Sequence, residues 1–380
     1  MKVAIFTDTY APEVNGVAKT LKRFTDHLSK RGHLFKVFAP TPETKEPLSS
    51  NHIHHFTSFP FIFYPECRFA FPNMLSVKSQ LQKFNPDIIH VATPSSVGLC
   101  GLHYAKKLNY PLVGSYHTNF DQYLEYYDLQ IFSKILWKYM HWFHQPLEKI
   151  FVPSLSTKEL LLSQDFQNIH IWSRGVNTHS FHPSKNKKQQ LKDRYHIKQP
   201  YLLTYVGRLA PEKDIKTLLS IMKKLSSRSD VHWLIVGDGP SKSFLQERSP
   251  SNVTFTGYLS GEELAMAYAS SDTFVFPSST ETFGNVVLES LASGTAVVTA
   301  NAGGVKSIIQ NRKTGVLCEP KETEDFTNAI NMLLDHPSLR KQMEKEARNY
   351  ALTQEWEQIL DNLIDEYFEV INQKKIIKYA

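Results

Sequence analysis

Two series of short apolar segments, separated by one polar stretch, constrain the fold of this 380-residue chain. Within each series, runs of a few apolar residues alternate with stretches whose apolar residues recur at helical spacing. Such short, unbroken apolar runs are typical of parallel strands that are buried on both faces, with the intervening helices as crossovers. The sequence therefore predicts an α/β protein in which two doubly wound, Rossmann-like domains face a central cleft.

The expected strands divide the chain into domains. In the first domain, residues 1–182, they are Val3–Phe6, Phe35–Ala39, Pro86–Val91, Pro111–Ser115, Phe151–Pro153 and Ile169–Ile171. In the second, residues 201–352, they are Tyr201–Val206, His232–Val236, Val253–Thr256, Thr273–Phe276, Ala296–Thr299 and Gly315–Leu317. Residues 183–200 are polar and bounded by prolines, which indicates a linker. Residues 353–380 form one amphipathic helical segment, for which a path back to the first domain is open.

Apolar runs and cysteines indicate the compartment. No run approaches the ~18 apolar residues of a membrane-spanning helix. The apolar start Val3–Phe6 stops at Asp8 and is too short for a signal peptide. Cys67, Cys100 and Cys318 are scattered, which disfavours a disulfide framework and a cysteine zinc site. We therefore expect a cytoplasmic protein.

Basic charge is concentrated in the first half of the chain. Residues 1–200 carry 24 Lys and Arg against 14 Asp and Glu, whereas the remainder carries 19 against 23. A basic half is typical of a protein that meets an anionic partner, such as a membrane surface or nucleic acid. A basic surface that serves only solubility explains the asymmetry equally well.

Two motifs of the first domain follow predicted strands. Gly16 stands at the turn into the first helix, where a glycine lets backbone amides approach a phosphate or a sugar. His117 follows the strand Pro111–Ser115, at the carboxyl end that faces the cleft. A histidine there can donate a hydrogen bond to a sugar hydroxyl or carry a proton. The GxGxxG and Walker A patterns are absent, which disfavours nicotinamide enzymes and P-loop nucleotidases.

Two cations follow the first strand of the second domain. Arg208 and Lys213 come after Tyr201–Val206, again at a carboxyl end. The planar guanidinium and the compact ammonium group both suit phosphate oxygens. Together they can neutralise a diphosphate leaving group, although two solvated surface cations are an equally good interpretation of the pair alone.

The stretch Thr280–Glu289 is the most informative motif. A helix is predicted to begin near Gly284, directly after a buried strand, so the amides of Gly284 to Val287 should be free at the positive end of the helix dipole. Glu281 precedes this helix and Glu289 lies within it. The two carboxylates can bind hydroxyls of a sugar and of a ribose, although for a generic pair a charge at the helix N-terminus and a solvated helix glutamate are the favoured interpretation.

In this order, the four motifs resemble those of glycosyltransferase family 4, a large family of retaining enzymes with the GT-B architecture. The resemblance spans nearly the whole chain. Further segments that carry it are Asp8–Gly16, Val236–Pro240, Gly257–Tyr258, Pro277–Ser278 and Ala302–Gly304.

The resemblance implies a role for each site residue. The catalytic residues that it implies are His117, Arg208, Lys213 and Glu281. The donor-binding residues that it implies are Gly16, Phe283, Gly284, Asn285, Val286, Val287 and Glu289. Arg208, Lys213 and the amides of Val286 and Val287 are expected at the diphosphate, His117 and Glu281 at the donor sugar, and Glu289 at the ribose.

The family implies a nucleotide-sugar co-substrate and no further cofactor. Many other glycosyltransferases hold Mg²⁺ or Mn²⁺ with an Asp-x-Asp pair, and no such pair occurs in this sequence. Arg208 and Lys213 are therefore expected in place of a metal ion. Cations and amides aimed at developing negative charge can each supply about 3 kcal/mol of transition-state stabilisation.

The acceptor is indicated by composition and by a branch of the family. Phe59–Pro72 is rich in aromatic residues and Lys134–His144 mixes cations with aromatic rings, as at a membrane interface, although internal packing explains both nearly as well. Tyr64–Pro72 and Ser115–Tyr127 resemble the branch of sulfoquinovosyl- and mannosyltransferases that modify diacylglycerol-type lipids. This resemblance implies transfer from a UDP-hexose or GDP-mannose to a lipid or glycolipid at the anionic inner face of the plasma membrane.

Other functions remain open at this stage. They are a transferase with a soluble or polysaccharide acceptor, a nucleotide-sugar epimerase, a pyridoxal-dependent phosphorylase and a nucleic-acid binder. No lysine stands in a context that indicates a Schiff base. The aromatic residues lie in proline-broken and helical segments rather than on an RNA-binding sheet, so no nucleic-acid partner is expected. The sequence leaves the oligomeric state open.

Overall fold

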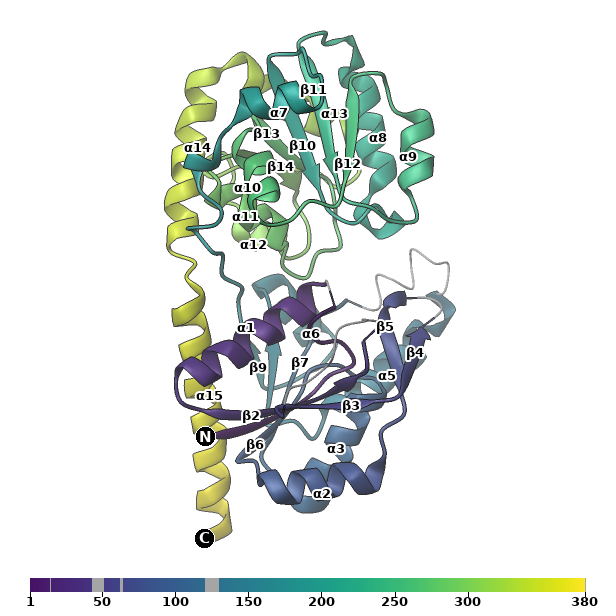
Figure 1. Cartoon of the computed structure of the whole chain (residues 1–380), viewed down its shortest axis with the longest axis vertical. Helices are drawn as coiled ribbons and strands as arrows, with labels where there is room; N and C mark the ends of the chain where they lie inside the picture. The colour runs from purple at the N-terminus through teal and green to yellow at the C-terminus, as the bar shows by residue number, and fades with distance from the viewer. Residues whose placement is uncertain (14, 43–50, 62–63, 120–129, 380) are drawn as a thin grey trace.

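Two parallel α/β sheets and a long C-terminal helix make up the fold (Figure 1). The computed structural model describes residues 1–13, 15–42, 51–61, 64–119 and 130–379. In Figure 1 the first domain lies below the second, and the C-terminal helix, drawn in yellow, runs along the first domain. The α/β class with two Rossmann-like domains, predicted from the sequence, is confirmed.

Seven parallel strands form the sheet in the described part of the first domain, in the order β3-β2-β1-β6-β7-β8-β9. The central strands are buried on both faces, as expected of parallel strands covered by helices. The strands are β1 (Lys2–Phe6), β2 (Leu34–Pro40), β3 (Ile53–Phe56), β6 (Ile88–Val91), β7 (Leu112–Ser115), β8 (Lys149–Val152) and β9 (Ile169–Ile171).

Alternate residues of β1 face two sets of helices. Ala4 and Phe6 share a buried cluster with residues of α2, α3, α5 and α6. Val3 and Ile5 share another with residues of α1 and α15. This division follows from the two-residue period of a strand. The helices are α1 (Gly16–Lys30), α2 (Met74–Phe84), α3 (Ser96–Leu108), α5 (Ser133–His144), α6 (Leu155–Ser163) and α15 (Trp356–Tyr379), and a 3₁₀ turn, η1 (Gln130–Phe132), precedes α5.

The sequence pattern does not predict three strands of the first domain. β3 contains two histidines and lacks an apolar run. β4 (Ser58–Phe61) and β5 (Tyr64–Ala70) pair as an antiparallel hairpin outside the main sheet. Prolines interrupt this hairpin, as is common in strands outside a central sheet position.

Six parallel strands form the sheet in the described part of the second domain, in the order β12-β11-β10-β13-β14-β15. All six lie where the sequence predicts them, to within one or two residues. They are β10 (Tyr201–Val206), β11 (Val231–Val236), β12 (Val253–Gly257), β13 (Thr273–Phe276), β14 (Ala296–Ala300) and β15 (Val316–Cys318).

Helices surround this second sheet. Residues 183–200, expected as a linker, contain a 3₁₀ turn and a short helix whose Leu191 is buried in the core of the second domain. The 3₁₀ turns are η2 (Pro183–Lys185), η3 (Pro211–Lys213) and η4 (Leu225–Ser227). The helices are α7 (Lys188–Arg194), α8 (Ile215–Lys224), α9 (Lys242–Arg248), α10 (Gly261–Ala269), α11 (Asn285–Ala292), α12 (Val305–Ile308), α13 (Thr323–Asp335) and α14 (Pro337–Leu352).

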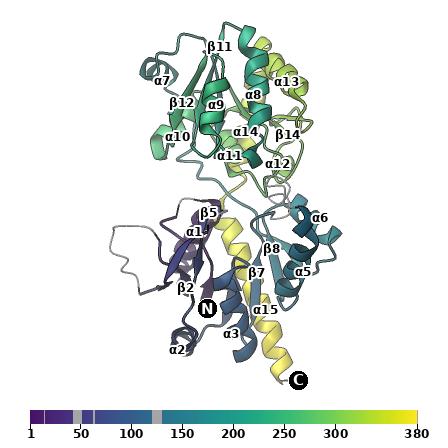
Figure 2. The same cartoon turned by 90° about the vertical axis from the view of Figure 1, so that its right-hand side faces the viewer.

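Helix α15 packs on the first domain, although it follows the last helix of the second (Figures 1 and 2). Asp361 of α15 accepts a hydrogen bond from His27 of α1 at 2.7 Å. Buried Lys149 of β8 pairs with Glu369 of α15 at 2.6 Å. The contacts with both α1 and β8 fix α15 across the sheet.

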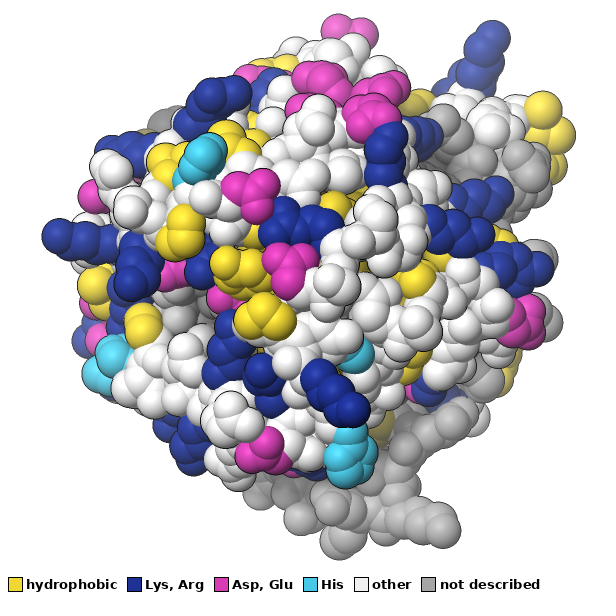
Figure 3. Space-filling model, turned by 90° about the horizontal axis from the view of Figure 1, so that it is seen from above, with side chains coloured by type: hydrophobic (Ala, Val, Ile, Leu, Met, Phe, Trp, Pro, Cys, Tyr) yellow, Lys and Arg dark blue, Asp and Glu magenta, His cyan; other side chains and the backbone are white. Residues whose placement is uncertain are grey.

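The outer face of the second domain is of mixed charge. In the view of Figure 3, from above, Lys and Arg side chains are interspersed with Asp and Glu side chains. Among the described helices, none is both long enough and apolar enough to span a bilayer.

Candidate functional site

The loops that carry the predicted site residues lie at the carboxyl ends of strands. Gly16 follows β1 and His117 follows β7, whereas Arg208 follows β10 and Glu281 follows β13. The order of the strands reverses between β1 and β6 in the first sheet, and between β10 and β13 in the second. Open α/β sheets bind ligands outside the carboxyl ends of the strands at such switch points.

Arg208 is held by a buried carboxylate. Its Nη1 donates to Oε1 of Glu212 at 3.2 Å, and Glu212 is fully buried in the turn η3. The other oxygen, Oε2, has no hydrogen-bond partner among the described residues. Breaking such a pair leaves an uncompensated buried charge, so Glu212 holds one edge of the guanidinium in place.

Lys213 and Glu281 come from loops after different strands and form an ion pair. Lys213 Nζ lies 2.5 Å from Glu281 Oε1, and the hydroxyl of Ser278 donates to the same oxygen at 3.1 Å. The side chains of Lys213 and Glu281 are 17% and 16% exposed. The structure thus brings two of the predicted site residues into direct contact, at a place that solvent reaches only partly.

Backbone contacts brace the loop from 278 to 283. Asp214 accepts from the amide of Ser279 at 2.9 Å and from its hydroxyl at 2.6 Å. The amide of Gly304 donates to the carbonyl of Glu281 at 2.6 Å. A Cβ on Gly304 would lie 2.3 Å from the carbonyl oxygen of Thr282, so only glycine allows this approach. The position of Glu281 is therefore set by packed backbone.

Helix α11 begins behind this loop with Gly284 as its N-cap. Gly284 has φ of +98°, and a Cβ there would lie 2.4 Å from Val305 Cγ1. The amide of Val287 donates to the carbonyl of Gly284 at 3.0 Å. This amide is therefore not free, which corrects the expectation that all amides from Gly284 to Val287 are open to a phosphate. The amide of Val286 precedes the first bond within the helix.

The residues on either side of Gly284 differ in their surroundings. Phe283 is 7% exposed and belongs to the core of the second domain, so its ring supports the helix start. Asn285 points away from that core toward the first domain, because its Nδ2 would lie 3.8 Å from a Cβ on Gly16. The Oδ1 atom of Asn285 is buried and has no hydrogen-bond partner in the described part of the chain. The N-termini of α1 and α11 thus meet across the two domains.

A second contact between the domains involves His117. The hydroxyl of Thr282 donates to the carbonyl of His117 at 3.0 Å, and the hydroxyl of Thr157 on α6 donates to the carbonyl of Thr282 at 3.4 Å. The structure therefore brings Gly16, His117 and the motif from Glu281 to Glu289 together where strand ends of the two sheets face each other.

The imidazole of His117 belongs to a buried chain of hydrogen bonds. Arg174, in the loop after β9, donates to His117 Nδ1 at 2.8 Å. His117 Nε2 lies 2.8 Å from the hydroxyl of Ser115, and this hydroxyl lies 2.8 Å from Nε2 of His90. Nδ1 of His90 contacts the hydroxyl of Tyr367 on α15. The chain of hydrogen bonds thus joins the C-terminal helix to His117.

Arg174 determines the protonation of His117. Because a guanidinium only donates, Nδ1 of His117 must accept, and the proton of the neutral ring is on Nε2 and is donated to Ser115. Burial lowers the pKa of His117 well below its ordinary value, and the charges of Arg174 and His90 lower it further. His117 is therefore neutral near pH 7, which does not favour proton transfer, one of the two roles that the sequence leaves open for it.

Glu289 lies on α11, and Tyr268 of α10 donates to its Oε2 at 3.1 Å. Burial raises the pKa of Glu289 to about 7, although the Tyr268 hydroxyl and the charges of Lys19 and Arg23 oppose the rise. Both cations belong to α1 of the first domain. Glu289 therefore faces the gap between α11 and α1, on the same side as Asn285.

The described residues contain no group of three or more His, Cys, Asp or Glu side chains that could hold a metal ion.

Two Rossmann-like domains, with cations, carboxylates and a helix N-terminus gathered where their strand ends meet, define the GT-B class of glycosyltransferases. The family described as Glycosyltransferase Family 4 matches residues 14–180, and the family described as Glycosyl transferases group 1 matches residues 186–350. Together the two matches cover both domains.

Relatives match over most of the chain. The GDP-mannose-dependent alpha-mannosyltransferase of Mycolicibacterium smegmatis is 34% identical over 99% of both chains. The sulfoquinovosyl transferase SQD2 of Arabidopsis thaliana is 32% identical over 90% of this chain and 68% of its own length. The alpha-monoglucosyldiacylglycerol synthase of Streptococcus pneumoniae is 28% identical over 83% of this chain and 75% of its own.

A solved structure has the same fold. Sucrose-phosphate synthase from Thermosynechococcus elongatus superimposes with a TM-score of 0.81 at 19% identity, over 98% of this chain and 100% of the other. The chain belongs to glycosyltransferase family 4 and is a glycosyltransferase with the GT-B fold. The family, the branch and the fold that the sequence resembles are confirmed.

Sequence reasoning missed the partners of His117. Arg174 directly follows β9, and the rule that strand ends face the cleft would have found it. His90 lies within β6, and Tyr367 is 277 residues further along the chain. Neither has a local pattern that distinguishes it from a core residue.

Proposed function

We propose that this enzyme transfers a hexosyl group from a nucleoside diphosphate sugar to a hydroxyl of a diacylglycerol-type lipid or glycolipid, with retention of the anomeric configuration and without a metal ion. The observation that carries the proposal is the contact between Lys213 and Glu281, beside Arg208 and the N-terminus of α11. A diphosphate sugar needs cations for its phosphates and an acceptor of hydrogen bonds for its hydroxyls, and both are present there.

Binding of the donor would replace the ion pair between Lys213 and Glu281 with contacts to the donor. The pair between Lys213 and Glu281 keeps a cation and a carboxylate together in a partly buried place. When the donor binds, phosphate oxygens compensate Lys213 and sugar hydroxyls donate to Glu281. Both charges are then partnered again, so the pair preorganises the pocket without a buried unpaired charge.

The chemical step places charge where these groups lie. The bond between C1 of the sugar and the phosphate oxygen breaks, negative charge grows on the diphosphate and positive charge grows on the sugar. Arg208, Lys213 and the amide of Val286 stabilise the diphosphate. Removing one such donor from a preorganised site typically slows a reaction by about 10²- to 10³-fold.

A group other than His117 takes the proton of the acceptor hydroxyl. Both ring nitrogens of His117 are occupied by Arg174 and Ser115. We infer that the acceptor hydroxyl attacks C1 from the face that the diphosphate leaves, forms the new C1–O bond and gives its proton to the departing diphosphate oxygen. Attack on that face retains the configuration. His117 positions the donor as a neutral group.

The relatives' names support the choice of substrates. They include a GDP-mannose-dependent mannosyltransferase and a monoglucosyldiacylglycerol synthase. We therefore propose GDP-mannose or a UDP-hexose as donor and a lipid on the inner face of the plasma membrane as acceptor, with the enzyme bound peripherally from the cytoplasm.

Transfer of radiolabelled sugar tests the proposal. GDP-mannose and UDP-hexoses are offered with dioctanoylglycerol, with a glycolipid and with glycerol, in the presence and absence of EDTA. We expect transfer to a lipid acceptor from one donor, unchanged by EDTA, and an α-linked product by ¹H NMR. An inverted product excludes retention, and a rate that EDTA abolishes excludes metal independence.

Variants of Lys213 and Glu281 test the ion pair on which the proposal depends, and a variant of Lys242 is the control. Lys213→Ala and Glu281→Gln should each abolish most transfer, whereas Lys242→Ala, which removes a more exposed cation paired with Asp238 in the same domain, should leave it unchanged. Full activity in the Lys213 and Glu281 variants would move the reaction to another part of the molecule.

A further inference from the structure

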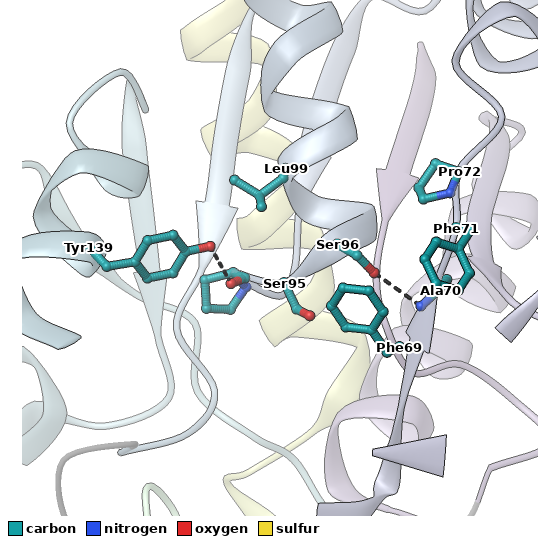
Figure 4. A pocket seen from close by; sticks show the side chains of 9 residues that line it. Phe69, Ala70, Phe71, Pro72, Ser95, Ser96, Leu99 and Tyr139 are labelled. Atoms are coloured by element: carbon teal, nitrogen blue, oxygen red, sulfur yellow. Dashed lines mark hydrogen bonds between the residues drawn. The ribbon is translucent and has the colours of Figure 1, made fainter. Parts of the chain in front are cut away.

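An apolar groove of about 540 Å³ lies beside the switch point of the first sheet (Figure 4). Its floor is Pro94 and Ser95 of the loop from β6 to α3, together with Ser96 and Leu99 of α3. One wall is the end of β5 with Phe69 and Phe71, and the opposite wall is Tyr139 of α5. The volume is within the range of about 300–1,000 Å³ that is typical of small-molecule sites.

Two hydrogen bonds hold the walls to the floor. The hydroxyl of Tyr139 donates to the carbonyl of Pro94 at 2.7 Å, and the amide of Ala70 donates to the hydroxyl of Ser96 at 3.1 Å (Figure 4). The groove is therefore built into the fold between the end of β5, the start of α3 and the middle of α5, and does not depend on one flexible side chain.

A hydrogen bond links the groove to the loop that leads from β1 to Gly16. The hydroxyl of Ser96 donates to Oδ1 of Asp8 at 3.0 Å, and Asp8 begins the loop from β1 to Gly16. In the sheet, β6 lies between β1 and β7, whose ends carry Gly16 and His117. A molecule whose hydroxyl reaches the donor sugar between Gly16 and His117 thus has the groove floor directly beside it.

Apolar side chains extend both walls outward. Phe59, Phe69 and Phe71 form a cluster of rings with centroids 5.5–5.7 Å apart. On α5, Ile135 and Trp142 are 64% and 57% exposed and lie at helical spacing from Tyr139. Exposed apolar side chains on both sides of a groove are typical of a ligand or membrane contact.

Two lysines lie among the exposed apolar residues of α5. Lys134 and Lys138 are exposed on α5, between the apolar residues, and neither takes part in an ion pair in the described part of the chain. Lysines whose stems lie among exposed apolar side chains match the boundary of a bilayer, where the chains are buried and the ammonium groups meet phosphates. This mixture of charge and apolar area favours a lipid over a peptide or a polysaccharide.

We propose that the groove between Phe71 and Tyr139 binds the hydrocarbon chain of the acceptor lipid, so that the chain anchors the lipid while its headgroup hydroxyl reaches the donor sugar past Ser96. This proposal rests on the proposed function, because it assigns a place to the acceptor of that reaction. It adds that recognition of the acceptor resides in its chain.

A chain-length series tests the assignment. Diacylglycerols with acyl chains of four, six and eight carbons share the same reactive hydroxyl and the same two esters and differ only in the hydrocarbon, and glycerol is the acceptor without chains. In the wild-type enzyme, the acceptor KM should fall by up to about fourfold for each methylene buried, until the groove is full. Phe71→Ser should flatten this dependence for the longer chains, and Phe71→Leu should restore most of it.

Two readouts separate groove binding from general damage. The donor KM and the slow hydrolysis of the donor in water should be the same in Phe71→Ser as in the wild type, because the change leaves the donor contacts intact. Leu162→Ser, which removes an equally exposed apolar side chain from α6, should leave the chain-length series unchanged. A series that Phe71→Ser flattens, with an intact donor KM, supports the proposal.

One set of outcomes would contradict the groove alone, and another would contradict the lipid acceptor as well. Transfer that is equally efficient for all chain lengths, or a series that Phe71→Ser leaves unaltered, overturns the groove as the chain site and leaves the proposed function standing. Transfer to no acceptor of the series, with donor hydrolysis retained, overturns both the lipid acceptor and the groove assignment.

Discussion

Replacement of Glu289 with glutamine is expected to weaken donor binding and to remove its dependence on pH. Burial raises the pKa of Glu289 to about 7, so about half of the molecules carry a proton there at neutral pH. Ribose hydroxyls that donate to the carboxylate stabilise its ionised form and lower the pKa. Binding of the donor therefore releases a proton, and the affinity of the wild-type enzyme rises with pH.

The size of the pH effect on the donor Kd follows from the pKa of Glu289. At pH 6 only about one molecule in ten has an ionised Glu289, so the Kd should be about tenfold larger at pH 6 than at pH 8 if the bound carboxylate stays ionised. Hydrogen bonds to a charged group contribute about 1.5–3 kcal/mol each, whereas the neutral amide of glutamine retains part of this. We expect Glu289→Gln to raise the Kd at pH 8 by about ten- to a hundredfold.

Isothermal titration calorimetry with GDP-mannose, between pH 6 and pH 8 and in two buffers of different ionisation enthalpy, measures the Kd and the released protons together. The intact donor has no phosphate group that titrates in this range, and His117 has a pKa well below it. Glu247→Gln, which changes an exposed carboxylate on α9, is the matched control and should behave as the wild type. Binding without proton release, or a wild-type Kd in Glu289→Gln at pH 8, refutes the ribose contact.

Four further results are expected from stability and rate measurements. The pKa of Glu289 is higher in the folded chain than its ordinary 4.5, so ionisation costs stability as the pH rises toward 7, and Glu289→Gln should melt at a higher temperature than the wild type at pH 8 but not at pH 4. Lys213→Ala should lower kcat by about 10²- to 10³-fold and change the donor Kd less, because the charge that it stabilises develops in the transition state; an equal loss of both would assign it to binding alone. Gly284→Ala should destabilise the protein by about 1–3 kcal/mol in a denaturant titration, because of its φ of +98°; unchanged stability contradicts the strained helix start. Arg174→Met leaves His117 buried and removes only the cation that faces its Nδ1, so burial should keep the pKa of His117 low, the lost charge should raise it only in part, and the fall of kcat at acidic pH should begin at a higher pH than in the wild type; an unaltered pH profile contradicts the positioning of His117 by Arg174.

Much of the fold follows from local sequence. The parallel strands are mostly apolar, so periodicity locates all strands of the second sheet and the central strands of the first. It misses β3, which lies at an edge and lacks an apolar run, and the hairpin of β4 and β5, which lies outside the sheet and is interrupted by prolines. The role of edge strands is set by their neighbours more than by their own composition.

The sequence predicts where the candidate site lies better than it predicts which side chains are in contact there. The rule that ligands bind at the carboxyl ends of parallel strands selects Gly16, His117, Arg208 and Glu281 without any structure. It does not show that Glu281 pairs with Lys213 or that the amide of Val287 is already bonded. Those facts depend on how two loops pack against each other, and a sequence pattern carries no information on such packing.

Partners distant in the sequence are the least predictable feature. Tyr367 reaches His90 only because α15 leaves the second domain and packs on the first sheet. The amphipathic pattern of α15 shows that one face is buried but not against which domain. Residues 62–63 of the aromatic segment Phe59–Pro72 and residues 120–127 of the segment Ser115–Tyr127 lie outside the residues that the structure describes. For residues 120–127, the resemblance to lipid-modifying enzymes stays a prediction.

The most direct test of the site is a crystal structure of the enzyme with GDP-mannose. The diphosphate should lie within hydrogen-bond distance of Arg208, Lys213 and the first amides of α11, with the sugar between Glu281 and His117. A donor bound on another surface, or one whose phosphates face away from both cations, would contradict the assignment of this cleft to glycosyl transfer.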